Sequence, residues 1–125
     1  MTQMPGSQPP IVNAMTIDVE DYFHVSVFDG VLPRTQWDSL ESRVCANTEK
    51  LLDIFTEYEV RGTFFVLGWV AERFPALVRR IAAGSHEIAS HGFAHRLIYD
   101  QTPAAFREDV RRAKAVLEDA GGVWS

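Results

Sequence analysis

The order of apolar and amphipathic segments is the feature that most constrains how this chain folds. Short apolar runs, typical of buried strands, alternate three times with segments of helical periodicity. Such an alternation predicts an α/β fold in which parallel strands are joined by helical crossovers. At 125 residues, the chain has room for one small domain. We expect strands at 11–18, 63–67 and 86–90, and helices at 42–58, 70–83 with an interruption near Pro75, and 103–120.

The remaining segments are expected to lie outside regular structure. Residues 1–10 are polar and rich in Pro and Gly, which predicts a flexible leader before a domain at 11–125. Residues 22–37 are aromatic but lack a helical period, and predict a long ordered loop of the kind that often carries function. Residues 91–100 predict a loop with partial helical turns, and Thr102 is expected to cap the last helix.

Charge and composition exclude some classes of function. A net charge of -5 argues against nucleic acid as a partner, because nucleic-acid binding needs a clustered basic surface. No apolar run approaches the ~20 residues of a membrane span, and the N-terminus lacks the features of a secretory signal, so we expect a cytoplasmic protein. The arginines that cluster in sequence fall on expected helices and are interpreted as solvated faces: Arg79, Arg80, Arg107, Arg111 and Arg112.

The single cysteine, Cys45, rules out an internal disulfide within this sequence. It lies in an apolar-periodic segment, where a small buried hydrophobe is the expected role and a reactive thiol the alternative.

Two groups of metal-ligating residue types follow two of the expected strands. Asp18, Glu20 and Asp21 stand at the end of the first strand, and His91 and His95 come directly after the third. The carboxyl ends of parallel strands meet at one edge of a sheet, where such folds place their ligands. The sequence therefore predicts a divalent-metal site for hydrolysis at this edge.

The spacing within each group suggests how the site works. On a helical turn, His91 and His95 would face the same way and reach one ion, and catalytic zinc commonly takes three protein ligands. In strand register Asp18 and Glu20 point to the same side, so one can bind the metal while the other acts as base toward metal-activated water. The alternatives are a solvated acidic loop and a chance pair of histidines.

Several aromatic and histidine residues are further candidates. Tyr22, Phe23 and Trp37 are candidate stacking partners for a sugar ring, and His24 is a candidate for the wall of the same cleft. His86 opens a strand, and we expect it to be structural and hydrogen-bonded to backbone.

Three segments resemble one known family. The stretches TIDVEDYFHV, RGTFFVLGWVAERFP and SHEIASHGFAHRLIYDQTP resemble, in this order, motifs of the polysaccharide deacetylase family with its NodB homology domain. The similarity covers residues 11–122 and looks closest to deacetylases of exopolysaccharide gene clusters linked to exosortase systems. It implies a distorted (β/α) barrel that removes acetyl groups, most often N-acetyl, from an acetylated polysaccharide or oligosaccharide.

The resemblance also implies roles for residues. Asp18 corresponds to the catalytic base, and His91 and His95 to metal ligands. For the third ligand, spacing along the strand favours Glu20 and residue type favours Asp21. The implied cofactor is a divalent ion, Zn²⁺ first, with Co²⁺, Ni²⁺ or Fe²⁺ as alternatives. A relative acting on a small cyclic amide is a minor alternative.

The length of the chain departs from the family pattern. A complete (β/α) barrel takes ~250 residues, so this sequence corresponds to the N-terminal β-α-β-α-β-α half. The family's later arginine and general-acid motifs have no counterpart in it. We therefore expect exposed sheet edges and a homo-oligomer that covers the open side. The alternative function is a catalytically incomplete half-domain that binds metal or carbohydrate or self-associates.

Overall fold

A three-stranded parallel sheet forms the centre of the molecule. The computed structural model describes residues 6–122. Strand β1 (Thr16–Val19) pairs with β2 (Thr63–Val66), and β2 pairs with β3 (Glu87–Ser90), so the strand order is β1-β2-β3. Both pairings are parallel, with Phe65 opposite Asp18 on one side and opposite Ala89 on the other. The α/β class predicted from the alternation is confirmed.

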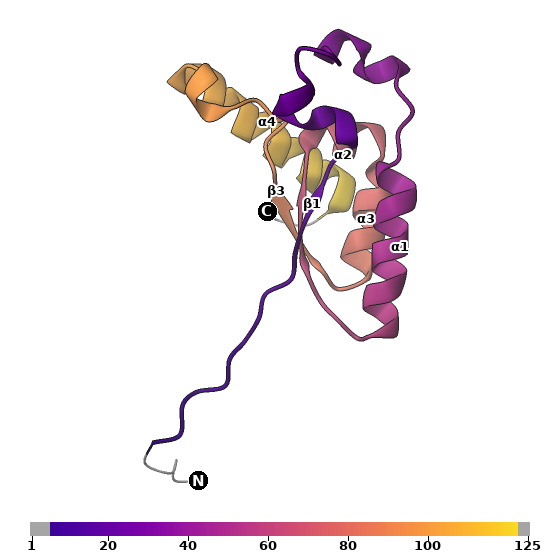
Figure 1. Ribbon diagram of the computed structural model, residues 1–125, viewed down its shortest axis with the longest axis vertical. Helices are drawn as coiled ribbons and strands as arrows, with labels where there is room; N and C mark the ends of the chain where they lie inside the picture. Colours follow the sequence, from indigo (N-terminus) through magenta and orange to yellow (C-terminus); the bar gives the residue numbers. More distant parts are fainter. Residues whose placement is uncertain (1–5, 123–125) are drawn as a thin grey trace.

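Helices provide every crossover between these strands. Helix α1 (Val44–Glu57) connects β1 to β2, and helices α2 (Gly68–Arg73) and α3 (Pro75–Ala83) connect β2 to β3. Helix α4 (Pro103–Gly121) follows β3 and packs against α2 and α3, whereas α1 lies beside α3 (Figure 1).

The expected helix boundaries are confirmed where capping or proline chemistry sets them. Pro75 begins α3 because its ring and missing N–H prevent α2 from continuing through it. Thr102 caps α4, where its side-chain oxygen accepts a hydrogen bond from the backbone N–H of Ala105 at 3.1 Å. Gly122 ends the same helix with a φ of 64°, in the left-handed region that favours glycine.

Only one face of the sheet is fully covered by the described residues. Along β2, Phe64 and Val66 are buried, whereas Thr63 and Phe65, which alternate with them, are only partly buried. Within residues 6–122 no further strand pairs with β1 or β3. The expected exposed edges of the sheet are therefore present. The largest fully buried side chains are those of Phe23, Phe64, Leu67, Ile81, Leu117, His24, Val19, Val66, Val70 and Val78.

The first strand is shorter than predicted. The apolar run was expected to form a strand from residue 11, but β1 begins at Thr16. Ile11 and Val12 are 90% and 88% exposed, because the strand pairing of β1 with β2 begins only at Thr16, opposite Thr63. Residues 6–14 run away from the sheet as an exposed segment (Figure 1), and residues 1–5 of the predicted leader lie outside the described residues.

The segment after β1 crosses the carboxyl edge of the sheet (Figure 1). It contains three short 3-10 helices, at Tyr22–His24, Ser26–Phe28 and Arg34–Ser39. A fourth, Ile98–Asp100, lies in the loop after β3. This connection is thus an ordered segment without an α-helix, as the missing helical period predicts.

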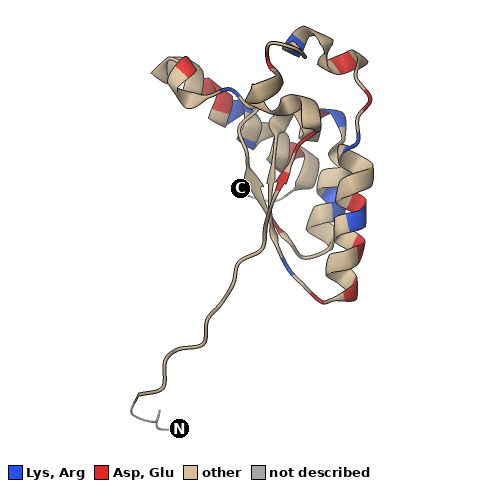
Figure 2. Cartoon of the chain, viewed as in Figure 1, with Lys and Arg blue, Asp and Glu red and all other residues tan. Residues whose placement is uncertain are grey.

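Helix α1 carries three acidic residues and one lysine, and basic and acidic residues alternate over the molecule as a whole (Figure 2). Arg80 pairs with Glu49 at 3.0 Å and with Asp53 at 2.9 Å, and Arg112 pairs with Glu72 at 3.4 Å. These pairs support the interpretation of the arginines as solvated helix faces. Among the helices of residues 6–122, none combines the length and apolar character needed to cross a bilayer.

Candidate metal centre

Glu20, His91 and His95 come together at the carboxyl edge of the sheet. Glu20 follows β1, and both histidines lie in the loop after β3. Oε2 of Glu20 lies 3.4 Å from Nε2 of His91 and 3.3 Å from Nε2 of His95. The three ligand atoms lie within 4.8 Å of one another, and all three residues are half-buried.

The histidine pair reaches this position without the helical turn that its spacing predicted. Residues 91–97 form a loop, and Gly92 and His95 have φ values of 73° and 54°. The prediction of a helical turn is therefore wrong, although the two imidazoles do meet, with ring centroids 5.1 Å apart. Backbone bonds hold the loop, because the N–H groups of Gly68 and Trp69 at the start of α2 donate to the carbonyls of Gly92 and Phe93, each at 2.9 Å.

Side chains on both sides add to this loop's support. Asp109 on α4 accepts a hydrogen bond from the backbone N–H of Phe93 at 3.1 Å, and Ser90 accepts one from that of Gly92 at 3.2 Å. Gly92 and Phe93, at the start of the loop, are thus held from β3, α2 and α4.

The chemistry of these three side chains fits a divalent ion. Two imidazole nitrogens and one carboxylate oxygen are a common catalytic zinc set. Two ligand atoms ~2.0–2.1 Å from one ion at the tetrahedral angle would be about 3.3–3.4 Å apart, which matches both Glu20–His separations. Oε2 of Glu20 and Nε2 of His91 are also buried without a hydrogen-bond partner, and buried polar atoms of this kind need a compensating partner.

The same closeness couples the charges of Glu20 and His91. The neighbouring Glu20 carboxylate raises the pKa of His91 above its usual range, and His91 lowers the pKa of Glu20. The Glu20 shift favours its ionised carboxylate, whereas the His91 shift favours the protonated imidazolium, so the metal-free residues form a charged pair and an ion that binds here must displace the His91 proton.

Asp18 stands beside this group but faces solvent. Its Oδ2 lies 3.9 Å from Nε2 of His91, and its side chain is 57% exposed. Asp18 and Glu20 therefore both reach His91, as their shared direction along the strand predicted, and Asp18 is the more accessible carboxylate.

Asp21 lies away from the three-residue group. It is 3% exposed, and its carboxylate accepts hydrogen bonds from the hydroxyl of Ser42 at 2.6 Å and from the backbone N–H of Arg43 at 2.8 Å. These bonds occupy its oxygens and tie the segment after β1 to the start of α1. Within the described residues, the geometry groups Glu20 and not Asp21 with the two histidines.

Two of the four predicted cleft residues are core residues instead. Phe23 and His24 are fully buried, with the His24 ring 4.7 Å from both Trp37 and Trp69 by centroid. The expectation that these two side chains line a cleft is wrong in this structure. The aromatic pattern of 22–37 reflects a core that this segment forms with α2.

His24 is a buried imidazole in that aromatic core. Its Nδ1 accepts a hydrogen bond from the backbone N–H of Asp21 at 2.7 Å, whereas its Nε2 has no partner. Burial lowers the pKa of His24 to about 4, so the ring is neutral at physiological pH.

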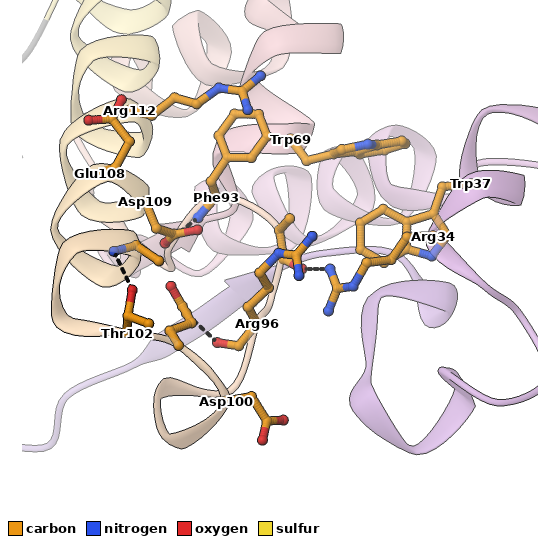
Figure 3. A pocket seen from close by; sticks show the side chains of 13 residues that line it. Arg34, Trp37, Trp69, Phe93, Arg96, Asp100, Thr102, Glu108, Asp109 and Arg112 are labelled. Atoms are coloured by element: carbon orange, nitrogen blue, oxygen red, sulfur yellow. Dashed lines mark hydrogen bonds between the residues drawn. The ribbon is translucent and has the colours of Figure 1, made fainter.

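The other two predicted cleft residues differ from each other. Tyr22 is 40% exposed and makes a T-shaped ring contact with Phe23. Trp37 is buried but lines a cavity of about 610 Å³ together with Trp69, Phe93 and Arg96 (Figure 3). A second cavity, of about 560 Å³, borders His91 and His95 and is lined by Tyr99 and Phe106.

The remaining sequence predictions concern structural residues. His86 accepts a hydrogen bond from the backbone N–H of Gly62 at 3.1 Å, which confirms its structural role. Cys45 is partly buried against the core, and burial raises the pKa of its thiol, which disfavours the reactive thiolate.

Two residues near the site were not found from the sequence. The hydroxyl of Ser26 lies 3.5 Å from Nδ1 of His95, and the guanidinium of Arg34 donates to the carbonyls of Ala94 and His95. Both come from the segment after β1. No spacing rule links them to a loop some sixty residues later in the chain, so the sequence carried no signal for these contacts.

Comparison with known proteins identifies relatives of one kind. The family model for polysaccharide deacetylases matches residues 36–125. A chitooligosaccharide deacetylase of Rhizobium leguminosarum bv. trifolii is 46% identical over 73 residues, 58% of this chain and 34% of that protein. A peptidoglycan-N-acetylglucosamine deacetylase of Bacillus cereus is 33% identical over 75 residues, 60% of this chain and 27% of that protein. The chain thus spans about a third of the length of these relatives.

Solved structures give the same result. A protein of Mycobacterium smegmatis assigned to the polysaccharide deacetylases is 30% identical, with a TM-score of 0.73 over 89% of this chain and 40% of that one. A deacetylase solved with substrate, T48, is 26% identical, with a TM-score of 0.66 over 89% of this chain and 44% of that one. The fold is therefore that of the NodB-type deacetylases, whose domain is a distorted barrel. With a family match over most of its length and this shared fold, the chain belongs to the polysaccharide deacetylase family.

Proposed function

We propose that this chain carries the metal-binding and base-bearing part of a hydrolase that removes acetyl groups, most often N-acetyl, from a polysaccharide or oligosaccharide. The observation that carries the proposal is the meeting of Glu20, His91 and His95 beside the exposed Asp18. The family match begins at residue 36, so the roles of Asp18 and Glu20 rest on this geometry and on the resemblance of the first motif.

Each residue has a distinct part in the proposed chemistry. His91, His95 and Glu20 would hold a divalent ion, which when bound supplies Lewis-acid polarisation of the acetyl carbonyl. Asp18 accepts the proton from the attacking water, because its carboxylate is accessible to solvent and borders the same group.

The names of the relatives support an amide substrate. The Bacillus cereus relative is a peptidoglycan-N-acetylglucosamine deacetylase, and the rhizobial relatives are chitooligosaccharide deacetylases. We therefore propose N-acetylated amino sugars as the substrate class and Zn²⁺ as the first ion to test. The exopolysaccharide and exosortase link stays a prediction. So does a homo-oligomer over the uncovered sheet face, which the solution mass of the chain checks.

Acetate release tests this function. The chain, purified together with any sequence that adjoins it in the encoded protein, is incubated with chito-oligosaccharides with added Zn²⁺ or Co²⁺, after chelation, and as Asp18→Asn. We expect metal-dependent acetate release that the Asp18→Asn variant lowers by about 10²–10⁴-fold while its metal content is unchanged. Release that persists after exhaustive chelation would contradict the metal dependence. Loss of metal by Asp18→Asn would make Asp18 a ligand rather than the base.

A further inference from the structure

We propose that Ser26 and Arg34 are positioning residues that set the ring and the backbone of His95 for metal binding. The inference rests on the proposed metal site, and it adds two residues outside the ligand set. Both belong to the segment after β1, which crosses the carboxyl edge of the sheet.

Arg34 holds the backbone on which His95 stands. One guanidinium nitrogen donates to the carbonyl of Ala94, and another donates to the carbonyl of His95 at 3.3 Å. Figure 3 shows the Arg34 side chain extending from beside Trp37 toward the loop between Phe93 and Arg96. A planar fork that binds two successive carbonyls fixes the peptide between them in a way that a single donor cannot.

That peptide needs an external support. His95 has a φ of 54°, in the left-handed region that residues with a side chain seldom adopt. Strained backbone of this kind persists only where surrounding contacts determine it, and such positions cluster at functional sites. The two hydrogen bonds from Arg34 fall on the carbonyls that flank the strained residue's own N–H and Cα.

Arg34 is itself held in place. Its guanidinium lies 4.8 Å from the centre of the Trp37 ring and 4.0 Å from the carboxylate of Asp29. The side chain is only 26% exposed. Because it is packed on one face and paired at its end, Arg34 reaches the loop in a defined direction.

Ser26 acts on the ring of the same histidine. Its hydroxyl lies 3.5 Å from Nδ1 of His95, on the opposite side of the imidazole from Nε2, which faces Glu20 at 3.3 Å. With the Nδ1 proton directed to the Ser26 oxygen, the lone pair of the neutral ring lies on Nε2, the atom available to an ion. Histidines that bind metals are commonly oriented by such a bond at their second nitrogen.

Metal affinity separates this role from simple loop stability. Dissociation constants for Zn²⁺ and Co²⁺ are measured by competition on the metal-free chain and on Arg34→Lys, Ser26→Ala and Ser26→Thr, together with thermal melts without metal. Arg80→Lys is the matched control, because Arg80 pairs with Glu49 and Asp53 on α1.

We expect Arg34→Lys and Ser26→Ala each to weaken affinity by about 10–100-fold, the usual effect of losing an outer partner of a ligand. Arg34→Lys keeps the charge and removes the planar fork, and Ser26→Thr keeps the hydroxyl and restores most of the affinity. Arg80→Lys leaves it unchanged.

The outcomes distinguish the inference from the function on which it rests. If the wild-type chain binds metal and both Arg34→Lys and Ser26→Ala bind it as tightly as the wild type does, the positioning role is overturned, whatever the melting temperatures. If Arg34→Lys does not fold, Ser26→Ala against the wild type decides, since the two differ by a single hydroxyl. A wild-type chain that binds neither ion would overturn the proposed function and the inference with it.

Discussion

Nε2 of His91 lies 3.4 Å from Oε2 of Glu20, although the two residues come from opposite edges of the three-stranded sheet. Among residues 6–122 neither atom has a hydrogen-bond partner, and the closeness of the two groups raises the pKa of His91 and lowers that of Glu20. An imidazole and a carboxylate held at this separation are suited to share one cation.

Removal of either member of the pair should remove metal binding. We expect His91→Ala and Glu20→Gln each to lower Zn²⁺ affinity by more than the 10–100-fold typical of outer partners, because a direct ligand is lost. Competition titration of the metal-free chain measures the change. His86→Gln is the control, since His86 directly precedes β3, at the end of the strand away from the site, and accepts a hydrogen bond from Gly62. Equal affinity in Glu20→Gln and wild type would exclude Glu20 from the site.

Removal of the Asp21 carboxylate should lower folding stability and leave metal binding largely intact. Its buried carboxylate bonds to Ser42 and to the backbone of Arg43, so Asp21→Ala leaves both donors without a partner. Hydrogen bonds to a charged group are worth about 1.5–3 kcal/mol, and we expect a loss of that order in the free energy of unfolding. Urea unfolding measures this loss, and Zn²⁺ affinity measured below the transition should change far less than in Glu20→Gln. A variant of wild-type stability that no longer binds metal would make Asp21 the third ligand.

Asp18, Glu20 and Asp21 show how much of the site can be predicted from the sequence. Strand periodicity placed Asp18 and Glu20 on one side, and the alternation of elements placed both clusters at one edge; the structure has both features. The choice between Glu20 and Asp21 stayed open because it depends on a tertiary partner. Asp21 is held by Ser42, which no local rule connects to it.

The predictions for the histidine loop and for the aromatic segment were wrong for related reasons. The spacing of His91 and His95 suits a helix, but Gly92 adopts a left-handed φ of 73° and backbone bonds from Gly68 and Trp69 hold the loop open. Phe23 and His24 were predicted to line a cleft because their aromatic segment lacks a helical period and was expected to form a loop. Their burial follows from packing on Trp69, a contact between segments far apart in sequence.

Buried His24 should make the chain sensitive to acid. Its pKa is lowered to about 4, mainly by burial, whereas an unfolded chain binds this proton near pH 6.5. Its contribution to stability is therefore complete above pH 6.5 and is lost as pH falls toward 4. The difference corresponds to roughly 3 kcal/mol between these limits.

Urea unfolding of metal-free protein across this pH range measures the effect. His24→Asn keeps an acceptor near the backbone N–H of Asp21 but cannot titrate, so its stability should fall less between pH 6.5 and 4. The variant will be less stable at pH 7 because the aromatic core loses ring contacts. The same pH slope in both proteins would assign the acid sensitivity to other groups.

Gly68 should tolerate no side chain, because α2 begins in direct contact with the histidine loop. A Cβ at this position would lie 2.5 Å from a ring carbon of Phe93 and 3.2 Å from the backbone of both Phe93 and Ala113. The donor bond from Gly68 to the carbonyl of Gly92 would have to lengthen as the two segments separate.

We expect Gly68→Ala to cost about 1–3 kcal/mol, the usual range for overpacking, and to weaken Zn²⁺ affinity as the loop moves. Gly30→Ala is the matched control, since nothing lies within 4 Å of a Cβ there. Denaturant unfolding and metal titration of both variants measure the two effects. Gly68→Ala with wild-type stability and affinity would show that the start of α2 does not constrain the loop that carries His91 and His95.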